Sequence, residues 1–249
     1  MGGELFSDLT GVYDAMIDWP KRLAAEEPFY RRWFERAGVG SVLDAACGTG
    51  WHASMFHSWK LRVEGADLSE AMIRRARTRF GESKRQRWVV RDVEQPIDAD
   101  EPFDAVVCTG NSLALAADRA TVRQAVGQML AAVPTGGIVI LHVLNLWHLP
   151  DGPCIWQKCK RATLPSGDTL ILKGVHRCDS QGFVDMVLTG LPGGSLLRSE
   201  SVPFLGLEQA DLEQMAFEAG AVRSQSFGDY QEHPYDRQKS VDLLMVIEK

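Results

Sequence analysis

The sequence lacks the cysteine spacing of a zinc knuckle or a disulfide framework. Its five cysteines are odd in number and contain no C-x-x-C pair. No apolar run approaches the ~20 residues of a membrane-spanning helix. The N-terminal MGGELFS also lacks the basic and apolar regions of a signal peptide. We therefore expect a cytoplasmic protein with no metal site and no membrane partner.

The sequence also has fewer basic than acidic residues. The 27 lysines and arginines are outnumbered by 33 acidic residues, which gives a formal net charge of −6 and argues against a general nucleic-acid-binding surface. The basic stretch from Arg74 to Arg91 is predicted to be the solvated face of an amphipathic helix and its loop. We expect a small-molecule substrate and no nucleic acid, and the sequence leaves homo-oligomerisation open.

Between residues 41 and 144, short apolar runs alternate with helical patterns. Candidate helices cover 68–80, with Ser69 as N-cap, and 122–133. Strands that alternate with helices predict a parallel sheet with helices on both faces. The candidate strands are 41–46, 62–67, 87–92, 103–109 and 137–144.

Two regions surround this alternation. Residues 1–40 are predicted to be a helical segment in which Pro20 and Pro28 each open a short helix. The rest of the chain, 41–249, is predicted to be one domain, with an antiparallel β insertion over 150–204. A helix over 212–219 and strands near 221–227 and 241–248 complete the domain.

The stretch VLDAACGTGWHA has the pattern of a strand, a tight turn and the start of a helix. Gly48, Gly50 and Ala53 fit the dinucleotide fingerprint G-x-G-x-x-G/A. Asp67 follows at the distance of a ribose-binding acid. Asp44, however, would repel a pyrophosphate and favour a cationic sulfonium ligand. The pattern therefore favours a positively charged cofactor over NAD.

Four motifs in order carry a resemblance. VLDAACGTG, GADLS, RDVE and CTGNSLALAAD follow successive strands, and together they resemble the S-adenosylmethionine-dependent methyltransferases with a seven-stranded Rossmann-like sheet. The GNS, YDAMIDWPKRL and GDYQEHPY segments are most similar to glycine and sarcosine N-methyltransferases. The resemblance implies an α/β, mostly parallel sheet with its last strand antiparallel. It also implies methyl transfer from S-adenosylmethionine to a small molecule, favouring an amine nitrogen.

Matched position by position, the resemblance implies a cofactor site. Gly48 and Gly50 would pack against the methionine part, and Asp67 would accept both ribose hydroxyls. Asp92 would receive the adenine amino group, and Arg22 would bind the cofactor carboxylate. The implied cofactor-binding set is Arg22, Asp44, Ala46, Gly48, Gly50, Asp67, Leu68, Met72, Asp92, Val93, Thr109 and Asn111.

Methyl transfer from a sulfonium is one in-line displacement, so the protein mainly aligns the acceptor and excludes water. The candidate catalytic residues are Asn111, which would orient the acceptor, and His142 and Tyr13, which would help to remove its proton. Simpler interpretations stay open, because Asn111 suits a helix cap, Arg22 a solvated helix and His142 a structural role. The segments 1–40 and 150–204 are expected to act as a lid.

The chain departs from glycine N-methyltransferases after the fifth strand. They carry H-R-N-Y-D there, with the arginine on the substrate carboxylate, whereas this chain has HVLNLW with Leu144 in the arginine's position. We expect a bulkier or less acidic acceptor than glycine, unless Arg161, Arg177 or Arg198 reaches in from the insertion. The alternative functions are an NAD-dependent oxidoreductase and a non-catalytic cofactor-binding or partner-binding protein.

Overall fold

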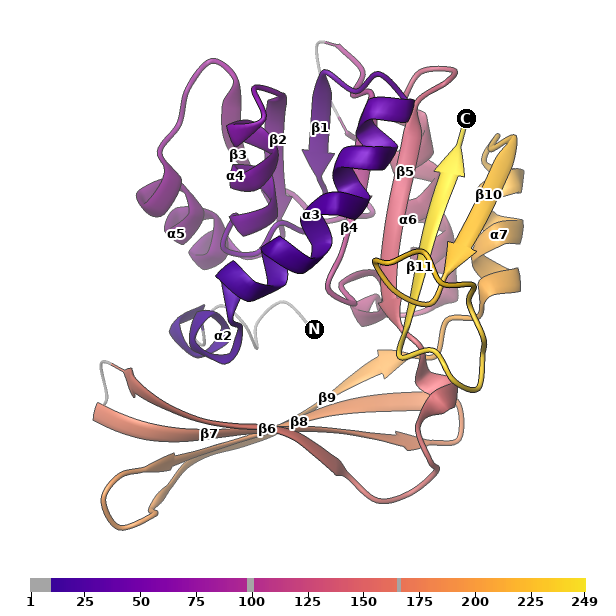
Figure 1. Cartoon of the computed structure of the whole chain (residues 1–249). Helices are drawn as coiled ribbons and strands as arrows, with labels where there is room; N and C mark the ends of the chain where they lie inside the picture. Colours follow the sequence, from indigo (N-terminus) through magenta and orange to yellow (C-terminus); the bar gives the residue numbers. More distant parts are fainter. Residues whose placement is uncertain (1–9, 98–100, 165–166) are drawn as a thin grey trace.

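The computed structural model describes residues 10–97, 101–164 and 167–249, so the MGGELFS segment lies outside the described residues. These residues form two sheets (Figure 1). The larger has seven strands in the order β10-β11-β5-β4-β1-β2-β3. Its strands are β1 (Ser41–Asp44), β2 (Arg62–Asp67), β3 (Gln86–Val90), β4 (Ala105–Cys108), β5 (Ile138–Leu144), β10 (Arg223–Phe227) and β11 (Asp242–Glu248).

The direction of the strands confirms the predicted α/β class. β1 pairs in parallel with both β2 and β4, and β11 is antiparallel to β5 and β10. The chain leaves β1 toward β2 and β3, then returns to place β4 on the other side of β1. The carboxyl ends of β1 and β4 therefore form a topological switch point, where open α/β sheets bind ligands.

Helices cover both faces of this sheet, as predicted. Ser69 caps α5 as expected, because its hydroxyl accepts a hydrogen bond of 3.3 Å from the backbone N–H of Met72. The apolar face expected of the second helix is buried in α6, from Val122 to Leu130. The helices are α4 (Trp51–Ser58), α5 (Glu70–Phe80), α6 (Arg119–Ala131) and α7 (Gln209–Glu218), with one-turn 3₁₀ helices η1 (Leu113–Leu115) and η2 (Leu146–His148).

Pro20 lies in the first turn of a helix, as predicted, but the prediction of a second short helix that begins at Pro28 is wrong. After α2 (Thr10–Met16) comes one helix, α3 (Trp19–Arg36), with Pro28 inside it. A proline inside a helix costs about 3 kcal/mol, because it removes a backbone hydrogen bond. Burial of the aromatic side chains after it outweighs this cost, at ~1.5–3 kcal/mol for each. These residues are Phe29, Tyr30, Trp33 and Phe34.

The predicted insertion is a second sheet with the strand order β6-β7-β8-β9, antiparallel throughout. One face packs against α2, where Val12 and Met16 meet Ile171, Met186 and Leu188. Figure 1 shows this sheet beside α2, apart from the larger sheet. Its action as a lid stays a prediction. The strands are β6 (Ile155–Leu164), β7 (Gly167–Cys178), β8 (Gln181–Gly190) and β9 (Leu196–Leu205).

Within the described ranges, no helix has both the length and the apolar character that a membrane span requires.

Candidate active site

A cavity of about 300 Å³ lies at the carboxyl ends of the parallel strands, at the switch point. The loops after β1, β2, β3 and β4 supply most of its wall, and α2 closes one side with Tyr13. The predicted residues that line it are Tyr13, Ala46, Gly48, Asp67, Leu68, Met72, Asp92 and Val93. Those that do not are Arg22, Asp44, Gly50, Thr109, Asn111 and His142.

Asp67, the last residue of β2, is fixed in this cavity by backbone amides. Its Oδ2 accepts a hydrogen bond of 2.8 Å from the N–H of Gly48, and its Oδ1 accepts one of 2.9 Å from the N–H of Ser69. Burial raises the pKa of Asp67, and these two amides oppose the rise. A carboxylate has about four acceptor positions, so both oxygens can still accept from a ligand.

Glycine is needed at the two positions of the turn for different structural reasons. Gly48 has φ +53°, lines the cavity and faces the Tyr13 ring, so a Cβ there would lie 3.6 Å from the tyrosine hydroxyl. Gly50 has φ +86° and caps α4, and its Cβ would come within 2.6 Å of Trp88 and 2.8 Å of Ala76. Gly50 therefore permits packing between α4 and β3, and it is outside the cavity wall.

Asp44 lies beneath the cavity at the end of β1. The side chain is fully buried, and neither carboxylate oxygen has a hydrogen-bond partner in the described part of the chain. Burial, reinforced by the charge of Asp67, raises the pKa of Asp44 to about 8. Ala45 and Ala46, its chain neighbours, line the cavity. A cation bound above them would stabilise the ionised form of this acid.

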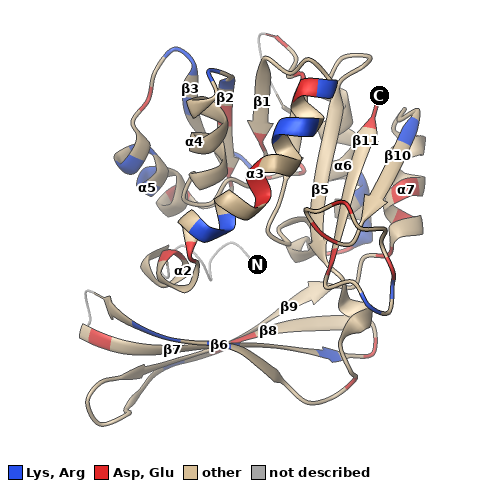
Figure 2. Ribbon diagram, in the orientation of Figure 1, with Lys and Arg blue, Asp and Glu red and all other residues tan. Residues whose placement is uncertain are grey.

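Polar contacts of Asp14 hold helix α2 over the cavity. Oδ2 of Asp14 pairs with Arg75 at 2.6 Å and Arg79 at 2.7 Å, and its Oδ1 accepts the hydroxyl of Thr49 at 2.6 Å. Both arginines belong to the basic group on α5 that Figure 2 shows. These bonds hold Tyr13 against the turn after β1, where burial raises its pKa to about 12.

Arg22 is engaged within its own helix. Its Nε donates to Glu26 at 2.7 Å, and the other oxygen of Glu26 lies 2.6 Å from Nε2 of His52. The guanidinium stacks near the ring of Trp19 at 5.5 Å. The predicted contact with a cofactor carboxylate therefore needs Arg22 to exchange or share its bond with Glu26.

Asn111 and His142, the other predicted catalytic residues, form hydrogen bonds within the protein. Oδ1 of Asn111 accepts the N–H of Leu144 at 2.9 Å, and the backbone of Asn111 has φ +70°. Nδ1 of His142 accepts the N–H of Gly110 at 3.1 Å, while its Nε2 lies 3.1 Å from Asp242. Both side chains thus tie the loop after β4 to β5. This fits the structural role considered for His142, whereas the helix cap considered for Asn111 is not formed, because η1 begins after Ser112 and its cap has no side-chain hydrogen bond.

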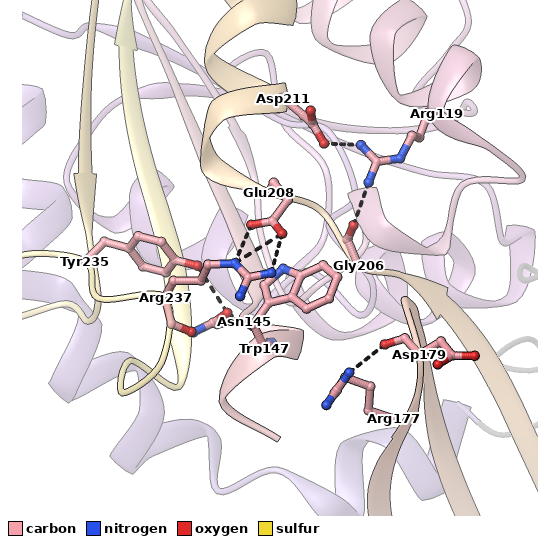
Figure 3. A network of polar contacts seen from close by, with 10 residues as sticks. All are labelled: Arg119, Asn145, Trp147, Arg177, Asp179, Gly206, Glu208, Asp211, Tyr235 and Arg237. Carbon is pink, nitrogen blue, oxygen red and sulfur yellow. Dashed lines mark hydrogen bonds and ion pairs between the residues drawn. The ribbon is translucent and has the colours of Figure 1, made fainter. Parts of the chain in front are cut away.

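Trp147 and Tyr235, which lie outside the cavity wall, belong to another network (Figure 3). The amide of Asn145 accepts the hydroxyl of Tyr235 at 3.1 Å and donates to the carbonyl of Arg237 at 2.8 Å. Arg237 stacks on Trp147 at 4.2 Å and pairs with Glu208 at 2.7 Å. This network joins the loop before β11 to the chain after β5 and to the start of α7.

The three insertion arginines also have partners. Arg161 pairs with Asp168 and Arg198 with Glu200. Arg177 donates to the backbone carbonyls of Leu149 at 3.1 Å and Asp179 at 2.8 Å. None of the three is free to bind an acceptor, unless these bonds are broken.

Several lining residues were missed by the sequence reasoning. Half of them lie in CTGNSLALAAD, the segment that contains η1. Only the first residues of that motif are among the predicted site residues. The rest of the motif could have been predicted to line the cavity as well. The missed lining residues are Ala45, Ser69, Glu94, Ser112, Leu115, Ala116, Ala117 and Thr121.

No metal site was predicted. Among the described residues, Cys154, His176 and Asp185 bring one ligand-type atom each within 4.8 Å of one another. They lie on the insertion, and none lines the cavity. A hydrogen bond of 2.6 Å already joins His176 to Asp185.

Comparisons with known proteins agree with this geometry. Residues 42–137 match the family described as Methyltransferase domain. The chain is 29% identical over 233 residues to Glycine/sarcosine N-methyltransferase of Parasynechococcus marenigrum (strain WH8102), covering 92% of this chain and 79% of that protein. It is 27% identical over 235 residues to Glycine N-methyltransferase of Homo sapiens, covering 83% and 79%.

A solved structure has the same fold. It is an amino pentose methyltransferase from Micromonospora echinaspora, solved with S-adenosylmethionine bound, with a TM-score of 0.70 and 20% identity over 96% of this chain and 95% of that one. This chain is an S-adenosylmethionine-dependent methyltransferase. The methyltransferase acts on a small molecule, and the oxidoreductase alternative is not favoured.

Proposed function

We propose that this methyltransferase transfers the methyl group to an amine nitrogen of its small-molecule acceptor. The relatives that span most of the chain support this, because their names describe N-methylation of glycine or sarcosine. Binding of the methyl donor, on which the transfer depends, is supported by Asp67, whose two oxygens are both anchored by amides beside a cavity of about 300 Å³.

The cavity wall fits the cofactor. Asp67 would bind both ribose hydroxyls, because each oxygen keeps an acceptor position. Leu68 and Met72 would contact the adenine ring, and Asp92 would accept from its amino group. The methionine part would pass Gly48, so the sulfonium would come near the buried carboxyl of Asp44.

Bound S-adenosylmethionine supplies a methyl group, which passes to the nitrogen lone pair as the carbon–sulfur bond breaks. Tyr13 keeps its proton at neutral pH, since its pKa is about 12, and so acts as a hydrogen-bonding group that orients the acceptor. His142 and Asn111 keep the loop after β4 in position. The acceptor enters as the neutral amine, and its product loses the extra proton to water, so no side chain need act as a base.

The segments at residues 1–40 and 150–204 would cover the reacting atoms. Tyr13 on α2 already lies over Gly48, and the insertion sheet packs against the other side of α2. Enclosure of this kind excludes water and holds the acceptor in line with the donor. A lid that moves would involve α2 together with the sheet.

A methyl-transfer assay tests the proposal. The protein is incubated with methyl-labelled S-adenosylmethionine and a panel of amines, phenols and carboxylic acids, and mass spectrometry locates the label. We expect labelled nitrogen and one S-adenosylhomocysteine for each product. Label on oxygen alone, or no product from any amine while the cofactor binds, would reject the proposal.

A further inference from the structure

Two lysines stand side by side on one face of the insertion sheet. Lys158 of β6 and Lys173 of β7 are direct cross-strand partners, so their side chains share a face. Lys173 lies between Ile171 and Val175, which alternate with the outward residues and are each only 1% exposed. The shared face is therefore the one that packs against α2 and the larger domain.

Neither ammonium group has an anionic partner among the residues that the structure describes. Nζ of Lys158 lies 3.5 Å from the backbone carbonyl of Met16, at the end of α2. Lys173 is partly buried and makes no hydrogen bond or ion pair there. Burial, with the charges of Lys158 and Arg22, lowers the pKa of Lys173 to about 8, so the group is still mostly charged at neutral pH.

The carboxylate in the same row as Lys173 does not pair with either lysine. Glu200 is two strands from Lys173 in that row, with the buried Met186 between them. One oxygen of Glu200 pairs with Arg198, and the other is buried without a hydrogen-bond partner in the described part of the chain. Arg22, whose charge also acts on Lys173, is itself paired with Glu26. Two adjacent cations that are partly withdrawn from water without an anion are unfavourable, and an anionic ligand would relieve this.

The lysines are connected to the cofactor cavity through α2, and neither of them lines it. Met16, whose carbonyl meets Lys158, is three residues after Tyr13. Residues at that spacing are neighbours on a helix. Tyr13 lines the cavity, so Lys158 lies next to the turn of α2 that closes it, and Lys173 is its neighbour across the strands.

We propose that Lys173 and Lys158 form a subsite for a carboxylate carried by the methyl acceptor. The acceptor class is then an amine that also bears an acid group. This inference rests on the proposed function, because it assumes that the acceptor nitrogen receives the methyl group near Tyr13. The two lysines would bind the acceptor carboxylate. Arg161, Arg177 and Arg198 do not do so while they keep their present partners.

The test uses matched acceptors. Glycine, sarcosine and longer amino acids are each compared with their primary amides in methyl transfer by wild type, Lys173→Met, Lys158→Met and Lys173→Arg. We expect the acids to be preferred, and Lys173→Met to lower their kcat/KM by about tenfold or more, since a charged hydrogen bond is lost. The amides should change by less than about twofold, and Lys173→Arg should keep the preference, because it retains the charge.

The control variant is Lys84→Met, which removes an exposed charge from the loop before β3 and should leave both acceptor forms unchanged. Affinity for S-adenosylmethionine should be the same in all variants. A wild type that prefers the amides, or a Lys173→Met variant that treats both forms as wild type does, would overturn the inference while N-methylation stands.

A binding measurement distinguishes a failure of this inference from a failure of the proposed function. Saturation-transfer NMR with the same acids and amides, on protein loaded with S-adenosylhomocysteine, does not need turnover. Binding of the acids alone, abolished in Lys173→Met, would support the subsite even if no nitrogen were methylated. Equal binding of acid and amide, or binding of neither, would overturn it.

Discussion

At the scale of single residues, two carboxylates at adjacent strand ends differ in their surroundings. Asp67 is bonded by two amides and faces the cavity, whereas Asp44 is buried beneath it without a hydrogen-bond partner in the described part of the chain. The first is suited to hold neutral hydroxyl groups. The second is suited to respond to a nearby positive charge, because burial raises its pKa to about 8 and a cation would favour loss of that proton.

Asp67→Asn should weaken the binding of S-adenosylmethionine. An amide side chain offers one oxygen where the carboxylate offers two, and loss of a charged hydrogen bond costs about 1.5–3 kcal/mol, or roughly tenfold to a hundredfold in Kd. Isothermal titration calorimetry measures this. Glu70→Gln is the control, since it removes a neighbouring exposed carboxylate outside the cavity wall. A Kd within twofold of wild type would remove Asp67 from the ribose site.

Asp44 predicts a pH dependence. Below its pKa of about 8 the group is mostly protonated, and a sulfonium above it favours the ionised form. Binding should therefore release a proton, and the affinity for S-adenosylmethionine should rise by up to about tenfold per pH unit until pH 8, then level off. S-adenosylhomocysteine, with a neutral sulfur, is the matched control. Parallel pH profiles for the two ligands would contradict a sulfonium close to Asp44.

Whether a site residue could be placed correctly from the sequence depends on whether the groups that hold it are close to it in sequence. Asp67, Leu68 and Met72 could be assigned to the cavity because strand ends and helix starts determine their place locally. Arg22, Asn111 and His142 could not, because the groups that hold them, such as Glu26 and the amides of Leu144 and Gly110, are not evident from any local pattern.

At the scale of elements, α2 depends on a few charged contacts for its position. Asp14 joins it to the turn after β1 through Thr49 and to α5 through Arg75 and Arg79, and this brings Tyr13 over the cavity. The other side of α2 packs on the insertion sheet. The helix thus links the two sheets.

Asp14→Ala should loosen α2 without unfolding the domain. The lost contacts are worth about 1–3 kcal/mol. Hydrogen exchange followed by mass spectrometry should show faster exchange over Thr10–Met16, together with a smaller loss of cofactor affinity than Asp67→Asn causes. Arg74→Ala, on the exposed side of α5, should change neither quantity. Unchanged exchange in Asp14→Ala would show that packing alone holds α2.

Gly50→Ala tests the start of α4. The new Cβ would meet Trp88 and Ala76 at a backbone φ of +86°, so we expect the free energy of unfolding to fall by about 2–4 kcal/mol. Urea denaturation measures the change. Gly127→Ala is the matched control, because its Cβ meets nothing within 4 Å inside α6 and should stabilise by up to ~1 kcal/mol. Equal stability of the two variants would contradict the packing role of Gly50.

Predictions of elements succeeded where local pattern dominates. The strands of both sheets and the capped helix α5 follow from alternation and capping residues. The break expected at Pro28 fails, because aromatic burial from Phe29 to Phe34 is a tertiary effect that no local rule includes.

At the scale of the whole molecule, the loops of the seven-stranded sheet form most of the cavity, α2 closes one side of it, and the insertion sheet packs against α2. The order of motifs along the chain was enough to predict the first sheet. The placement of the second sheet against α2 could not be predicted, since it depends on contacts between segments far apart in sequence, such as Met16 with Met186.

The most direct test of the account is a crystal structure of the protein with S-adenosylmethionine bound. We predict the ribose hydroxyls within hydrogen-bonding distance of both oxygens of Asp67, the adenine against Leu68 and Met72, and the sulfonium next to Gly48. A cofactor bound elsewhere, or one that leaves Asp67 without a contact to the ribose, would contradict it.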